Sequence, residues 1–151
     1  GTYVPLLPRF DPEIKELGII YPAVDNKSCG SMPGEESNED FMRAMRRDGY
    51  QYLYRGILDD VWNKHLYGKD DLSPMNNIAY LKNTKLFIGH GKKDRCIHYS
   101  KSVTYYKKIS SMFPNRQKQF LLKLYPNTGH EAATSNKAVY DCLKWLGVKE
   151  R

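Results

Sequence analysis

Three short runs of apolar residues indicate β-strands that are buried on both faces. They cover residues 18–21, 86–89 and 120–125, and Pro22 stops the first of them. Apolar runs of this length that end at glycine or proline are typical of parallel strands covered by helices. We therefore expect a parallel sheet, with the strand at residues 86–89 between the other two.

Stretches with helical periodicity lie between and around these runs. The first helix is expected to end near Leu7, because Pro5, Pro8 and Pro12 interrupt it. Longer helices are expected over residues 38–49, 50–66, 100–113 and 136–146. Strands that alternate with helices in this way predict an α/β protein with right-handed crossovers.

Apolar positions also predict which faces of the last two helices point inward. In the helix at 100–113 the inward residues would be Val103, Tyr106, Ile109, Met112 and Phe113. In the final helix they would be Val139, Cys142, Leu143 and Leu146. Ser135 is expected to cap that helix, and Gly147 follows its end.

Two side chains with catalytic chemistry follow the second and third strands. Asp94 comes after Gly89-His-Gly91, and His130 comes after the turn Pro126-Asn-Thr-Gly129. The carboxyl ends of parallel strands meet at one edge of the sheet, where sites are built. We expect the glycines to permit the tight turns there. A carboxylate oxygen of Asp94 and a ring nitrogen of His130 are then expected roughly 2.6–3.2 Å apart.

The order strand, Gly-His-Gly-x-x-Asp, helix, strand, Gly-His, helix resembles the C-terminal half of an α/β-hydrolase. The resemblance extends from Leu17 to Trp145 and includes Ser73-Pro74, which is common in esterases and prolyl-oligopeptidase-like enzymes. It implies acyl transfer by a Ser-Asp-His triad. His130 would be the general base, and Asp94 would hold its imidazole in the required tautomer.

The nucleophile of such a triad is missing from the sequence, since no Gly-x-Ser-x-Gly occurs. In the resembled family this motif precedes the helix that leads into the first strand here. We therefore expect the serine upstream of Gly1, in an N-terminal half of the same fold that acts as a partner. The outer edge of the strand at residues 18–21 would then be bare in this chain alone.

The resemblance implies one domain portion over residues 1–151, with a cap-like insertion over about 26–78. Aromatic residues of this interval would either line a substrate pocket or pack in the core.

Carboxylesterase-like hydrolysis of an acyl ester is the first functional interpretation. A prolyl-oligopeptidase-like serine peptidase and a non-catalytic binding module on the hydrolase fold are the alternatives. The substrate would be a small ester or a peptide, and no cofactor is implied.

Composition and residue spacing argue against three other classes of protein: nucleic-acid-binding, membrane-spanning and zinc-binding. The formal net charge is +7, but the basic residues form no dense run and no nucleic-acid motif accompanies them, so a solvated basic face is expected. No run of about twenty apolar residues predicts a membrane span. Three cysteines without Cys-x-x-Cys spacing do not predict a zinc site, and Cys142 is expected in the core.

Other interpretations of single residues remain open. Ser31 in Cys29-Gly-Ser-Met-Pro33 is either a displaced nucleophile or an ordinary loop serine. His90, His98 and His130 would form a metal site if the fold brought them together, although their spacing does not require one. His90 is otherwise expected to be structural. For the two triad candidates, the alternatives are a turn-forming aspartate and a loop histidine.

Overall fold

The computed structural model describes residues 3–24, 47, 58–66 and 69–148. Most of the expected cap-like insertion, with Ser31 and the helix expected at residues 38–49, lies outside them. Helices and strands alternate along the chain in the following order: η1 Val4–Leu6, α1 Leu7–Phe10, β1 Glu16–Ile20, α4 Asp59–Leu66, η3 Pro74–Asn76, η4 Ile78–Asn83, β2 Lys85–Gly91, α5 Ser100–Met112, η5 Pro114–Gln119, β3 Phe120–Tyr125 and α6 Ala132–Leu146.

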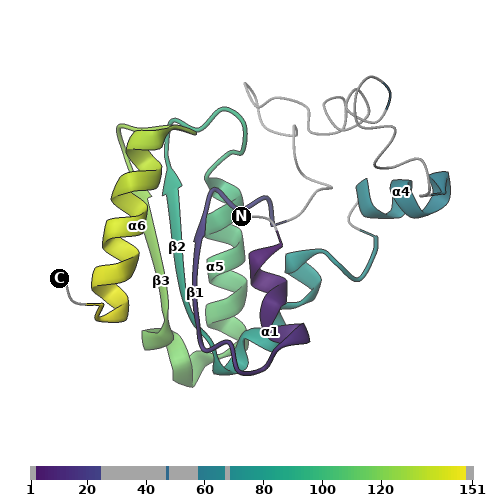
Figure 1. The fold of residues 1–151 in the computed structure, drawn as a ribbon, viewed down its shortest axis with the longest axis horizontal. Helices are drawn as coiled ribbons and strands as arrows, with labels where there is room; N and C mark the ends of the chain where they lie inside the picture. Colours follow the sequence, from purple (N-terminus) through teal and green to yellow (C-terminus); the bar gives the residue numbers. More distant parts are fainter. Residues whose placement is uncertain (1–2, 25–46, 48–57, 67–68, 149–151) are drawn as a thin grey trace.

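The sheet has three parallel strands in the order β1-β2-β3, so the expected parallel α/β architecture and the central place of β2 are confirmed. Helix α6 covers one face of the sheet and α5 lies against the other (Figure 1). On its outer side β1 pairs with no other strand of the described residues, as expected. No helix in that part of the chain is both long enough and apolar enough to cross a bilayer.

Alternate residues of the strands supply two separate apolar clusters. The cluster on the α5 face contains Leu17, Ile19, Leu86, Ile88 and Ile109, together with residues of the segment that follows β1 and of η4. The smaller cluster on the α6 face contains Phe87, Tyr125, Ala138 and Cys142. The buried position expected for Cys142 is thus confirmed.

The inward faces of both long helices match the expected ones only in part. Ile109 and Cys142 are buried as expected, and the expected Tyr106, Phe113 and Leu146 pack against the two apolar clusters. In α5 the buried side chains include Ser102, Tyr105 and Ile109, whereas Met112 is 46% exposed. In α6 they are Thr134, Ala138 and Cys142, whereas Val139 and Leu143 are exposed. The reason in α6 is space. A Cβ atom on Gly18 would lie 2.6 Å from the sulfur of Cys142, and one on Gly89 would lie 2.7 Å from the Cβ of Ala138. Small side chains therefore face the sheet here.

The helix boundaries also need correction. Helix α1 continues to Phe10 rather than ending near Leu7, because Pro8 occupies its first turn, where proline is tolerated. Helix α6 begins at Ala132 after Glu131, so Ser135 lies inside it and does not cap it. Its end at Gly147 is confirmed by the left-handed backbone of that residue. In the expected helix at 50–66, the described part starts at Asp59.

Candidate active site

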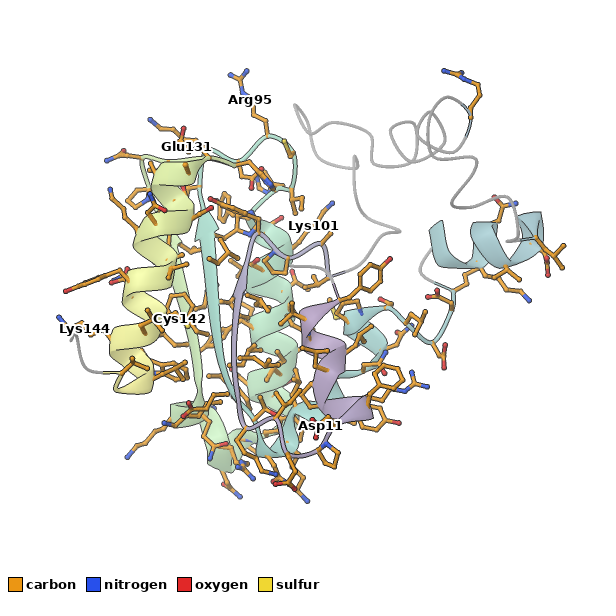
Figure 2. The ribbon with its side chains drawn as sticks, in the orientation of Figure 1. Asp11, Arg95, Lys101, Glu131, Cys142 and Lys144 are labelled. Atoms are coloured by element: carbon orange, nitrogen blue, oxygen red, sulfur yellow. The ribbon has the colours of Figure 1, made fainter. Side chains whose placement is uncertain are left out.

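The loops after β2 and β3 carry Asp94 and His130, and backbone hydrogen bonds tie these loops together. The amide of Lys92 donates to the carbonyl of Tyr125 at 2.8 Å, and the amide of Lys93 donates to that of Thr128 at 2.9 Å. Both loops leave the sheet at the end toward which the β2 arrow points, where Arg95 and Glu131 are labelled in Figure 2. The expected placement at one sheet edge is confirmed.

Two glycines allow this close approach of the loops. A Cβ atom on Gly91 would collide with the carbonyl oxygen of Thr128, and one on Gly129 would lie 2.9 Å from the carbonyl oxygen of Lys93. Neither glycine has a positive φ. What requires glycine at both positions is therefore the close approach of two backbones and not a left-handed conformation.

The Asp94 carboxylate is buried and fully hydrogen-bonded. Its Oδ1 accepts the amides of Cys96 and Ile97, each at 2.9 Å. Its Oδ2 lies 2.9 Å from Nδ1 of His130 and 3.2 Å from Nε2 of His90. Burial acts to raise the pKa of Asp94, but hydrogen bonds from His90 and the Ile97 amide and the nearby His130 outweigh it, so that the pKa is lowered. The group is therefore held as a carboxylate.

His90 has a supporting position behind this carboxylate. Its ring is fully buried, with Nδ1 2.7 Å from the hydroxyl of Ser102 and Nε2 2.8 Å from the carbonyl oxygen of Ile97. A carbonyl oxygen only accepts, so Nε2 carries the proton and Nδ1 accepts from Ser102. The same Nε2–H faces Asp94, which confirms that His90 has a structural role near the acid loop.

His130 is the more accessible partner of the pair, with a side chain that is 40% exposed. Because Oδ2 of Asp94 is an ionised acceptor, Nδ1 of His130 donates in the 2.9 Å contact. The lone pair of the neutral ring is therefore on Nε2, on the far side of the ring from Asp94. This tautomer is the one that a general base for a hydroxyl group requires. The distance lies in the expected range.

Tyr21 belongs to the same site, and sequence reasoning missed it by placing it inside the first strand. It follows β1, its φ is +48°, and its ring stacks on that of His130 with centroids 4.3 Å apart and planes 28° apart. Its hydroxyl donates to the carbonyl of Glu131 at 2.6 Å. The sequence contained one indication that Tyr21 is a site residue: it lies beyond the carboxyl end of a strand, directly before Pro22.

One group in the described part of the chain has metal-ligand chemistry: Asp94, Cys96 and His130 place ligand atoms within 4.8 Å of one another. The oxygens of Asp94 already face four hydrogen-bond donors, so a cation would have to displace the histidine that they orient. The set therefore fits proton transfer better than a resident metal. The alternative set of His90, His98 and His130 does not assemble, because His90 faces Ser102 and the Ile97 carbonyl instead.

Comparison with known protein families identifies a match over most of the chain. The model of the prolyl oligopeptidase family matches residues 36–147, which is about three quarters of the chain and includes both Asp94 and His130. A search of the curated proteins finds no match. The matched segment begins after β1 and contains β2, α5, β3 and all of α6.

Proposed function

The chain belongs to the prolyl oligopeptidase family, and from this membership we propose that Asp94 and His130 are the acid and the general base of a catalytic triad. The family is one of serine hydrolases with the α/β-hydrolase fold. One observation carries the assignment of roles. It is the 2.9 Å contact between Nδ1 of His130 and Oδ2 of a buried Asp94, which leaves Nε2 available to a substrate-side partner.

In the proposed reaction, a serine hydroxyl gives its proton to Nε2 of His130 as its oxygen attacks the acyl carbon. The imidazolium that forms is stabilised by Asp94, which stays ionised because two backbone amides and His90 also hold its charge. His130 then returns the proton to the leaving group. Water next attacks the acyl-enzyme in the same way, which releases the acid product and returns a proton from His130 to the serine oxygen. Asp94 itself does not change its protonation state.

We propose that the serine comes from an N-terminal half of the same fold, since the sequence contains no Gly-x-Ser-x-Gly. Two features support the proposal that this N-terminal half docks beside β1. The outer edge of β1 has no strand partner among the described residues. On the α6 face next to it, Gly18, Ile20 and the exposed Val139 and Leu143 line an apolar hollow of about 130 Å³. Apolar surface beside an open strand edge is suited to a further strand and helix.

The acyl substrate proposed here is a peptide, because the matched family is that of prolyl oligopeptidases. Carboxylesterase activity is the second candidate, and it rests on the resemblance of the Gly-His-Gly-x-x-Asp and Gly-His segments to esterases. Both use the same base and acid, so the residues of the pair do not distinguish them. A non-catalytic module would keep the fold and hydrolyse neither substrate.

The complete enzyme, meaning this chain with the segment that carries the serine, provides the test. We expect it to react with a fluorophosphonate and to hydrolyse a peptide amide, with p-nitrophenyl acetate as the ester comparison. His130→Ala should lower kcat by at least about 10³-fold. His98→Ala is the matched control, since this half-buried histidine bonds Ser100 and not Asp94. Normal turnover of the His130 variant would refute the role of His130.

The 151-residue chain by itself gives a second readout. Without the serine it should show no burst of p-nitrophenol above that of buffer. A burst would mean that a residue of this chain is the nucleophile, and Ser31→Ala would then test the displaced-nucleophile interpretation.

A further inference from the structure

We propose that Tyr21 is a positioning residue that fixes the plane of the His130 imidazole and so directs its Nε2 toward the nucleophile. This inference rests on the proposed role of His130 as general base. Tyr21 lies outside the segment matched by the family model, and the proposed mechanism so far gives it no part.

The backbone of Tyr21 is strained. Its φ of +48° makes it the one non-glycine residue with a positive φ in the described part of the chain. A left-handed backbone is unfavourable for an aromatic residue, because it brings the Cβ atom too close to the following carbonyl oxygen. The proline that follows adds to this, because it favours an extended conformation of the residue before it. Such a conformation persists only where surrounding contacts enforce it, and it is found most often at functional sites.

The contacts that enforce it come from two directions. The amide of Tyr21 donates to the carbonyl of Gly89 at 3.1 Å, which ties it to the end of β2. Its hydroxyl reaches across the site to the carbonyl of Glu131 at 2.6 Å and the hydroxyl of Ser135 at 2.9 Å. The backbone of Tyr21 and the hydroxyl at the tip of its side chain are therefore both anchored, and the ring between them is held in place.

The anchored ring lies between the two histidines that face Asp94. It stacks on His130 with a centroid separation of 4.3 Å and meets His90 edge-on at 5.9 Å. The hydrogen bond to Asp94 fixes one corner of the His130 ring but leaves the ring free to rotate about that bond. A flat surface against the ring removes this rotation, so the two contacts together determine where Nε2 points.

Orientation of this kind affects the rate more than it affects binding. A misplacement of about 1 Å at a reacting group can cost about 10²-fold in rate. The stacked aromatic face also lies against the ring that becomes positively charged during proton transfer, which is a favourable arrangement for a cation. Both effects act on kcat and leave the KM for the substrate nearly unchanged.

Two substitutions distinguish the effect of the Tyr21 ring on kcat from the effect of its strained backbone. Tyr21→Asn removes the ring while asparagine tolerates a left-handed backbone, so kcat should fall roughly 10- to 100-fold in the complete enzyme. Tyr21→Phe keeps the ring and should retain most of kcat, although loss of the two hydroxyl contacts lowers its thermal midpoint. Tyr140→Asn on the exposed side of α6 is the matched control and should change neither value.

An NMR measurement tests the stacking without an activity assay. The ring protons of His130, observed by NMR in the wild-type enzyme, should be shifted upfield by the stacked tyrosine and should lose this shift in Tyr21→Asn.

Wild-type protons at unshifted positions would overturn the proposal even if no variant folds. So would wild-type kcat in Tyr21→Asn, or an equal fall of kcat in the Phe and Asn variants. Loss of activity in His130→Ala beside normal kcat in Tyr21→Asn would refute the role of Tyr21 alone. Full activity in His130→Ala would refute the proposed function itself.

Discussion

Replacing Asp94 by asparagine tests the proposed mechanism most directly, because the surroundings of the side chain determine how the new amide must lie. The amides of Cys96 and Ile97 both donate to Oδ1 at 2.9 Å, so this position requires an acceptor. The amide oxygen of asparagine therefore has to stay there. Its NH₂ group must then occupy the position of Oδ2, facing His130 and His90.

This forced orientation inverts the hydrogen bond to His130. An NH₂ group donates, so Nδ1 of His130 has to accept, and the ring proton moves to Nε2. In that tautomer Nε2 has no lone pair for the proton of the serine. The expected loss in kcat is about 10⁴-fold, which corresponds to about 5 kcal/mol of transition-state stabilisation. The same NH₂ group also faces the Nε2–H of His90, and this clash of donors should destabilise the fold by about 1–3 kcal/mol.

The assay compares kcat of wild type, Asp94→Asn and Asp71→Asn in the complete enzyme. Asp71 is the control because it is also a hydrogen-bonded aspartate, with Arg9 at 2.7 Å, but in an exposed position that the proposed reaction does not use. The proton position on the His130 ring is measured in parallel by ¹⁵N NMR. An Asp94→Asn enzyme that keeps more than about a tenth of wild-type kcat, or a ring that keeps its proton on Nδ1, would refute the reasoning.

Two further predictions concern the loops and the acid. Because the pKa of Asp94 is lowered in the folded state, its carboxylate stabilises the fold above the ordinary value of 3.8, and this contribution is lost as the pH falls through the folded-state pKa. Urea unfolding between neutral and strongly acid pH should thus be more pH-dependent in wild type than in Asp94→Asn, and equal dependence would contradict the assignment. Gly91→Ala should lower kcat at least about tenfold, because its Cβ atom meets backbone atoms of Thr128 that cannot move aside. Gly18→Ala, which meets only the side chain of Cys142, should reduce the unfolding temperature without a comparable loss of kcat.

The inward faces of the helices show where a pattern of apolar residues is misleading. Val139 and Leu143 are larger and more apolar than Ala138, yet Ala138 faces the sheet because Gly89 leaves room only for a small side chain. In α5, Ser102 is buried because it hydrogen-bonds the buried His90. Neither cause is visible in the periodicity of one segment, since each depends on a residue of another segment.

The sequence by itself determined the three strands and the edge of the sheet at which the site lies. Apolar runs that end at glycine or proline specify buried strands, and the alternation of strands with helices specifies parallel pairing. Asp94 and His130 follow two neighbouring strands, so their shared edge follows from connectivity alone. These properties depend on local order along the chain, which a sequence contains in full.

Only the tertiary structure decided how the side chains of the site contact one another. The hydrogen bond from His130 to Asp94, the stacking of Tyr21 on His130 and the bond from the Tyr21 hydroxyl to Glu131 join segments 36 to 110 residues apart. Gly91 was expected from the sequence to give the Asp94 loop its freedom, and only the structure shows that the backbone of Thr128 passes against it. Whether contacts of this kind form depends on differences of a few tenths of an ångström in the distances between separate loops. Those distances are set by the packing of the whole sheet and its helices, and by no single stretch of residues.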